Sequence, residues 1–189
     1  NIRVFRAKHL TFQATTMQSS LLLVVAGAVL LTTTRAFSLP GSKRRMENVV
    51  LRYFDGVNKQ DPAQIKSCFA EEAIIRDVCG INDAKRIVKA QDLTDRCMDF
   101  LAAHPDTLVK FHHGPECGRD SRWVVAHWYE TGTLTGKSCG VEPTNSPMAV
   151  EGQTRFYVNR DLKISEMVVT RTFSEWETKM LETAKVSYA

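Results

Sequence analysis

His127 is the residue of this sequence best placed for acid–base chemistry. His127 alternates with Trp123, Val125 and Tyr129 along a predicted strand. If that face lines a cavity, the imidazole lies among aromatic rings with a pKa suited to proton transfer. The alternative is a buried histidine that only hydrogen-bonds a neighbour. The opposite face of the strand holds Val124, Ala126, Trp128 and Glu130.

Two further side chains could act with His127. Asp77, on a short predicted strand over residues 73–78, could orient the imidazole, act as a base if buried, or simply pair with Arg76. Tyr53 lies on the apolar stripe of the first predicted helix, where it could donate its phenol to a ligand carbonyl or serve as core packing. The predicted catalytic residues are therefore His127, Asp77 and Tyr53.

The late strands supply the predicted ligand contacts. Strand alternation places at least one of Gln153, Thr154 and Arg155 toward a cavity, but alternation alone does not say which. The predicted ligand-binding residues are Trp123, Tyr129, Trp128, Thr154 and Phe156.

Metal ligands and cofactor motifs are not predicted. His112, His113 and Cys117 invite a zinc interpretation, but adjacent side chains on a strand point to opposite faces, so the two histidines cannot easily share one ion. The five cysteines include no C-x-x-C pair, and the sequence contains no phosphate loop, nucleophile elbow or iron–sulfur spacing.

The elements that must position these residues follow from the apolar pattern, which changes once from helical to alternating. The first helix carries an apolar face at Met46, Val49, Val50, Tyr53, Phe54 and Val57. Asp61-Pro62 caps a second helix, and Asn82 or Asp83 would cap a third that runs to about Leu101. Further strands are predicted at residues 107–113, 121–135, 148–158 and 162–171, and Ser174 with Glu177 forms a capping box for a C-terminal helix.

No helices separate the late strands, so a parallel doubly wound sheet is excluded. The predicted class is α+β: three N-terminal helices packed on a strongly curved antiparallel sheet, with a short C-terminal helix. Such a sheet would leave a conical cavity against the first helix, and apolar cavities of this kind bind small molecules.

The N-terminal segment is predicted to be an address rather than part of the fold. Residues 1–36 contain no acidic side chain and include an unbroken apolar run over residues 21–31, too short to cross a bilayer of about 30 Å but typical of a signal peptide. We assign residues 17–36 to the signal peptide and residues 1–16 to upstream sequence of doubtful status. The junction from Thr34 to Pro40, followed by a transit-type segment over residues 37–45, resembles the bipartite plastid presequences of algae with secondary plastids. A plastid location is expected, with secretion as the alternative, and no stable membrane span in the mature protein.

Charge excludes one class of partner. Residues 1–36 hold four basic side chains, so 21 of the 25 basic residues remain to balance 21 acidic ones. A near-neutral mature protein gives no electrostatic case for nucleic acid. We expect one domain at residues 46–175 and a C-terminal helix or tail at residues 176–189.

Three segments carry a family resemblance. The helix pair reads Tyr53-Phe54-Asp55-Gly56-Val57-Asn58, Asp61-Pro62 and Phe69-Ala70-Glu71-Glu72-Ala73; the long strand reads His127-Trp128-Tyr129-Glu130-Thr131-Gly132-Thr133-Leu134-Thr135-Gly136; the closing hairpin reads Val150-Glu151-Gly152-Gln153-Thr154-Arg155-Phe156 and Lys163-Ile164-Ser165-Glu166. Over roughly residues 44–172 the sequence resembles the SnoaL-like polyketide cyclases of the nuclear-transport-factor-2-like superfamily.

The resemblance implies a conical pocket for a small hydrophobic molecule and two classes of function. One is a cofactor-independent isomerase, dehydratase or cyclase; the other is a non-catalytic ligand-binding module, or one that forms a homodimer through the sheet. Three polar cavity positions of the family are changed here, to Thr154 in place of an acidic base, to Leu134 in place of a histidine and to Met167-Val168 in place of His-Trp. These changes argue against aldol-type cyclisation.

Overall fold

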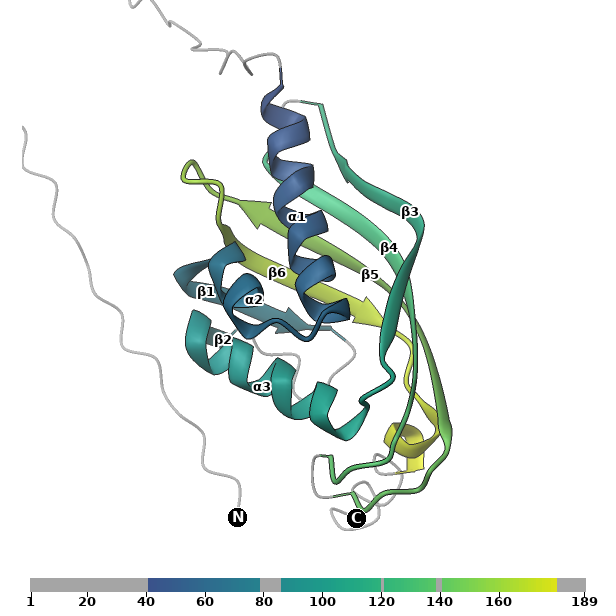
Figure 1. Ribbon diagram of the computed structural model, residues 1–189. Coiled ribbons are helices and arrows are strands. Elements are labelled where there is room, and N and C mark those ends of the chain that lie inside the picture. Colours follow the sequence, from purple (N-terminus) through teal and green to yellow (C-terminus); the bar gives the residue numbers. More distant parts are fainter. Residues whose placement is uncertain (1–40, 79–85, 120, 139–140, 180–189) are drawn as a thin grey trace, which may run out of the picture. The chain divides into compact units, whose positions relative to one another are not determined.

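The computed structural model describes residues 41–78, 86–119, 121–138 and 141–179, all within the unit that spans Ala36–Ala189 (Figure 1). The helices are α1 (Ser42–Asn58), α2 (Pro62–Cys68) and α3 (Ala90–Ala103), and the strands are β1 (Phe69–Asp77), β2 (Arg86–Lys89), β3 (Leu108–Cys117), β4 (Trp123–Thr133), β5 (Pro147–Val158) and β6 (Ile164–Arg171). Several predictions concern segments outside the described residues. These are the upstream segment, the signal peptide, the caps at Asn82 and Asp83, and residues 180–189 of the tail.

The first two helices form where the sequence predicts them. α1 buries the apolar stripe from Met46 to Val57 and begins at Ser42, so the end of the predicted transit segment is already helical. The Asp61 side chain caps α2 by accepting a hydrogen bond from the Gln64 N–H at 2.9 Å. Asn58 then ties the end of α1 to β3: its amide exchanges two hydrogen bonds with the backbone of Val109, at 2.8 and 2.9 Å.

The region before α3 differs from the prediction. Residues 86–89 form strand β2 against β1, and α3 starts only at Ala90, after Lys89, which makes no side-chain cap. Ile87 and Val88 are β-branched and can pair with β1, so tertiary pairing outweighed the helical spacing.

Among the described residues, six strands form one sheet in the order β2-β1-β6-β5-β4-β3. Strands β3 to β6 make the predicted antiparallel meander. β1, however, runs parallel to β6, so the sheet is mixed rather than wholly antiparallel. The α+β class is confirmed.

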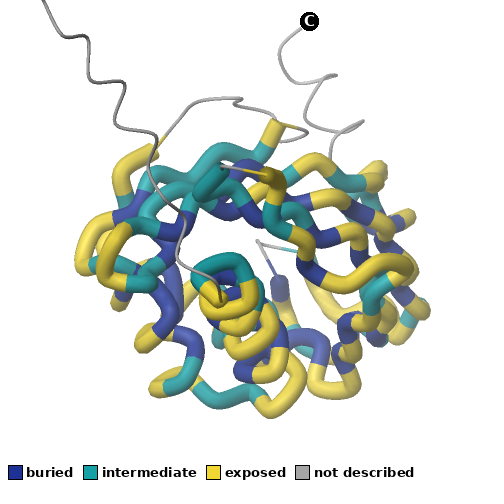
Figure 2. The backbone as a smooth tube through the Cα atoms, turned by 90° about the horizontal axis from the view of Figure 1, so that it is seen from above, coloured by how far each residue is buried: buried dark blue, intermediate teal, exposed yellow. Residues whose placement is uncertain are grey.

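The sheet wraps around the helices. α1, α2 and α3 lie on one face of it, and in the view along α1 the strands curve around that helix (Figures 1 and 2). Burial alternates almost perfectly along β5, where the even-numbered residues from Met148 to Val158 are buried and most odd-numbered ones are exposed. The core therefore sits between the concave face and α1.

The end of the described chain also folds as predicted. The Ser174 N–H and Glu177 Oε2 are 2.9 Å apart, and the Glu177 N–H returns a bond to Ser174 Oγ at 3.4 Å, which is the capping box at the start of helical residues 175–179. No helix in the described part of the chain is long and apolar enough to span a membrane.

Candidate functional site

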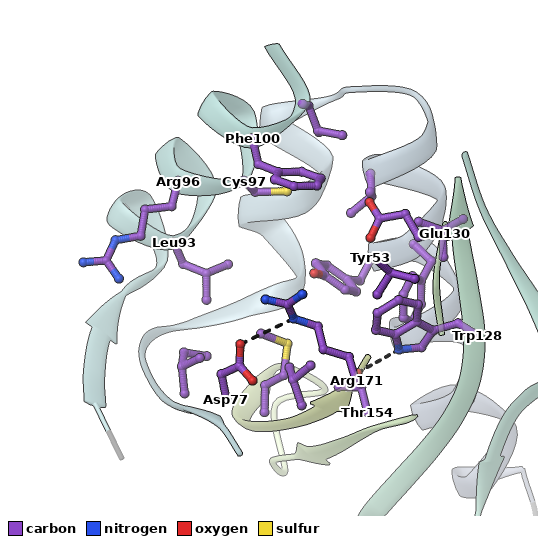
Figure 3. A pocket seen from close by; sticks show the side chains of 18 of the residues that line it. Tyr53, Asp77, Leu93, Arg96, Cys97, Phe100, Trp128, Glu130, Thr154 and Arg171 are labelled. Carbon is purple, nitrogen blue, oxygen red and sulfur yellow. Dashed lines mark hydrogen bonds and ion pairs between the residues drawn. The ribbon is translucent and has the colours of Figure 1, made fainter. Parts of the chain in front are cut away.

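A cavity of about 470 Å³ opens between the helices and the concave face of the sheet (Figure 3). Its size lies within the range of small-molecule sites. Most of the lining is apolar. The charged lining residues are Asp77, Arg86, Arg96, Glu130, Arg171 and Glu177.

Aromatic rings form one wall. The Tyr53 ring on α1 meets Phe54, Phe69 and Phe156 at centroid distances of 5.0, 5.4 and 5.7 Å. Burial raises the pKa of the Tyr53 phenol well above its usual value, and nearby Cys97 and Glu130 raise it further. Tyr53 therefore stays protonated and presents an O–H donor at physiological pH.

The Trp128 indole forms a second wall, and a glycine on β5 makes room for it. Gly152 faces Trp128 across the β4–β5 pair, and a Cβ added at position 152 would lie 2.5 Å from the indole ring. Without that Cβ the indole lies over β5 and its Nε1–H donates to Thr154 Oγ1 at 2.9 Å. Thr154 thus holds an aromatic side chain in place.

Glu130 is a half-buried acid in the cavity wall. Its neighbours across the sheet are Val109 on β3 and Val150 on β5, and both valines line the cavity. Loss of hydration raises the pKa of the Glu130 carboxyl from 4.5 to about 7; the Arg171 cation opposes this rise and the Glu177 carboxylate adds to it. A group with this pKa can both accept and donate protons near neutral pH.

Arg171 pairs with the other two carboxylates that line the cavity. Its guanidinium contacts both oxygens of Glu177, at 2.8 and 3.1 Å, and its Nε lies 3.5 Å from Asp77 Oδ2. Figure 3 shows the side chains of Tyr53, Glu130 and Arg171 directed into the same space. The site can therefore offer a proton-transfer group, a neutral O–H donor and a paired cation around one apolar volume.

Five of the predicted site residues line this cavity: Tyr53, Asp77, Trp128, Thr154 and Phe156. The expectation that His127 faces the cavity is wrong. His127 is exposed on the convex face, together with the partly exposed Trp123 and Tyr129. Both faces of β4 are apolar enough to be buried. Because alternate residues point to opposite faces, the sequence does not decide which of the two sets faces the cavity.

On the convex face His127 is one of three neighbouring histidines. Its ring lies 4.9 Å from the ring of His112 and 6.2 Å from that of His113. β3 shifts register between Phe111 and His113, so these neighbours do not alternate as the sequence predicted. Within the described residues, no group of three or more His, Cys, Asp or Glu side chains could hold a metal ion.

Sequence reasoning missed Glu130 and Arg171. A usable signal existed for Glu130, because it shares a strand face with Trp128 and would have entered the site had that face been chosen. Arg171 carried no such signal: it ends β6, and only the pairing of β6 with β5 and β1 brings it to the cavity.

Comparison with known proteins agrees with this architecture. A family model described as SnoaL-like domain matches residues 50–167. No curated protein matches the chain.

Solved structures show the same fold at low sequence identity. A candidate SnoaL-like polyketide cyclase from Jannaschia sp. CCS1 is 18% identical, with a TM-score of 0.59 over 73% of this chain and 90% of that one. AclR, a candidate hydroxylase from Streptomyces galilaeus, is 18% identical, with a TM-score of 0.58 over 69% and 81%. IdmH, a candidate polyketide cyclase from Streptomyces antibioticus, is 16% identical, with a TM-score of 0.55 over 74% and 98%.

Proposed function

Since the chain belongs to the SnoaL-like domain family, we propose that it binds a small hydrophobic molecule in the conical cavity and catalyses a proton-transfer reaction on it. The observation that carries this proposal is the Glu130 carboxyl, half-buried beside two cavity-lining valines, with its pKa raised to about 7. Isomerisation, dehydration and ring closure are the reaction types that such a group can serve.

Isomerisation of an unsaturated ketone illustrates the roles. The Glu130 carboxylate removes a proton from the carbon next to the carbonyl, and the electron pair moves onto the carbonyl oxygen. The Tyr53 O–H, kept protonated by burial, donates a hydrogen bond to that oxygen as it becomes negative. Glu130 then returns the proton to another carbon of the conjugated system, so the reaction balances without an added reactant.

Thr154 and Trp128 have a supporting role in this scheme. A threonine hydroxyl does not take protons from carbon at neutral pH, and here it already accepts the bond from the indole. Glu130 supplies the carboxylate that the family's usual base position lacks in this chain. Asp77 balances the charge of Arg171 rather than orienting His127.

Deuterium exchange tests the role of Glu130. The full chain is incubated in heavy water with a panel of hydrophobic unsaturated ketones, and uptake of deuterium next to the carbonyl is followed by mass spectrometry. Glu130→Gln should lower the exchange rate by about 10²–10⁴-fold. Glu151→Gln, a matched change on the convex face of the neighbouring strand, should leave the rate unchanged. An unchanged rate in Glu130→Gln would exclude Glu130 as the base.

A non-catalytic dimerising module is the second candidate, because one surface favours it. The convex faces of β4 and β5 present Trp123 and Tyr157, whose rings are 5.4 Å apart, with the Arg155 guanidinium 5.9 Å from the Trp123 ring. Aromatic and arginine side chains are enriched in protein interfaces. Sedimentation of the wild type and of Trp123→Ser decides: a homodimer through this face should be lost in the variant, and a wild-type monomer would contradict it.

The N-terminal segment makes plastid import part of the proposal, with secretion as the alternative. The basis is sequence alone: the acid-free residues 1–36 with their short apolar run, followed by the Phe37 junction. A fluorescent protein fused behind residues 1–45 should accumulate in the plastid of an alga with a secondary plastid. Fluorescence in the medium would favour secretion instead.

A further inference from the structure

Two arginines stand at the opening of the cavity. Arg86 and Arg96 both line the cavity and are exposed to solvent, whereas the lining residues Trp128 and Phe156 are buried. In Figure 3 the Arg96 side chain extends from α3 away from the aromatic wall. Exposed residues that also line the cavity must lie at its mouth.

The fold directs both side chains to this mouth. Arg86 is opposite Ile75 in the antiparallel β1–β2 pair, and residues opposite each other share a sheet face; Ile75 lines the cavity. Arg96 lies three residues after Leu93 and four before Phe100 on α3, which puts it on the same stripe as these two cavity-lining residues.

The two mouth arginines differ from Arg171 in their counter-charges. Arg171 is paired with Asp77 and Glu177. None of the ion pairs between described residues involves Arg86 or Arg96. Asp92 and Asp99 are one turn away from Arg96 on α3, but neither lines the cavity, and exposed pairs along a helix are weak.

Resting on the proposed function, we propose that the ligand is an amphiphilic anion, with a hydrophobic body inside the cavity and a carboxylate or phosphate group held at the mouth by Arg86 and Arg96. The planar guanidinium presents a fork of N–H donors that matches both anions. The apolar lining accommodates the body, and the mouth cations orient it, so that the opposite end of the ligand reaches Tyr53 and Glu130.

Three probes with the same alkyl chain test this assignment. Binding of dodecanoate, dodecyl phosphate and dodecanol to the full chain is measured by isothermal titration calorimetry at pH 8, where both anions are ionised. At least one anion should bind about ten-fold more tightly than the alcohol, and the better of the two identifies the head group. Raising the salt concentration to 1 M should weaken binding of the anion but not of the alcohol.

Variants connect the preference to the two residues. Arg86→Gln and Arg96→Gln should each weaken anion binding about three-fold, and the double variant should abolish the preference over dodecanol. Arg160→Gln, an exposed arginine in the β5–β6 turn, is the matched control and should change nothing. If a variant folds poorly, the salt series on the wild type still tests whether the preference for the anion is electrostatic.

The outcomes separate this inference from the proposal beneath it. Equal affinity for the alcohol and both anions, or an undiminished preference in the double variant, overturns the role of the mouth arginines while leaving a hydrophobic ligand site in place. An equal loss in Arg160→Gln also overturns it, because the effect would then be one of overall charge. Failure of all three probes to bind contradicts the hydrophobic site itself and this inference with it.

Discussion

Partial burial of the Glu130 carboxyl costs folding free energy, and the cost depends on pH. Its pKa is about 7 in the folded chain against an ordinary 4.5, so between these values the folded state holds a proton that the unfolded state has released. Stability therefore falls as the pH rises through this window, by up to about 3 kcal/mol from Glu130 alone.

Glu130→Gln removes the titration and should reverse this loss. We expect the variant to equal the wild type within about 1 kcal/mol at pH 4 and to exceed it by about 2–3 kcal/mol at pH 8. Urea unfolding at both pH values measures the difference. The exposed Glu151→Gln should show no such dependence on pH, and a pH-independent effect of Glu130→Gln would mean that the pKa of the Glu130 carboxyl is not raised in the folded chain.

Glu177 adjusts the proton affinity of Glu130 from a distance. Its negative charge raises the pKa of Glu130, and it also offsets the Arg171 cation, which lowers that pKa. Glu177→Gln removes the charge but keeps a side chain that can complete the capping box with Ser174.

The pKa of Glu130 should therefore fall in Glu177→Gln, in a titration followed by carbon NMR of labelled glutamate side chains. Glu175→Gln, two residues away and paired only with exposed Lys179 among the described contacts, is the control and should leave the pKa of Glu130 unchanged. A rise in the Glu177→Gln variant would contradict the electrostatic arrangement.

At the scale of elements, the site depends on how closely the side chains of β4 pack against the backbone of β5. Gly152 allows the Trp128 indole to lie over β5, and the Arg171 position on β6 is paired with the same glycine. The missing side chain at position 152 thus gives space to the Trp128 indole.

Gly152→Ala should push the Trp128 ring out of place and break its bond to Thr154. We expect a loss of about 1–3 kcal/mol in the free energy of unfolding, together with a changed tryptophan fluorescence. Gly114→Ala on β3 is the matched control, because a Cβ there meets nothing within 4 Å. Equal effects of the two variants would show that the ring can move freely.

At the scale of the whole described unit, two hydrophobic clusters contribute residues to the cavity lining. The main one joins α1 to the sheet, while a smaller cluster packs Trp176 on Ala103 and Leu134. Leu134 is completely buried in this cluster, so an apolar residue suits the position. The smaller cluster holds the C-terminal segment, and so Glu177, against the site.

Trp176→Ala should release that segment. A loss of about 3–5 kcal/mol is expected for a buried tryptophan, with weaker protection of the backbone around residues 174–179 in hydrogen exchange. Trp123→Ala, on the convex face, should cost less because Trp123 is only partly buried. Unchanged exchange in Trp176→Ala would mean that the ion pair of Arg171 with Glu177 alone holds the segment.

The sequence by itself determined the parts that rest on local chemistry. Hydrophobic spacing predicted α1, a capping aspartate predicted α2, alternation predicted the four-stranded meander, and Ser174 with Glu177 predicted the last helical turn. Each of these patterns acts within a few residues of the chain, so it can be read without knowing the fold. The same hydrophobic spacing placed Tyr53 on the inward stripe of α1, where it lines the cavity.

Only the tertiary structure decided which face of β4 turns inward. Both faces carry aromatic and aliphatic residues, so the sequence offered His127 and Glu130 as alternatives separated by one step of parity. Packing against α1 and the space at Gly152 selected the Trp128 face, which brought in Glu130 and left His127 outside. Non-local pairing likewise turned residues 86–89 into an edge strand and carried Arg171 to the cavity, because such contacts depend on segments far apart in the chain.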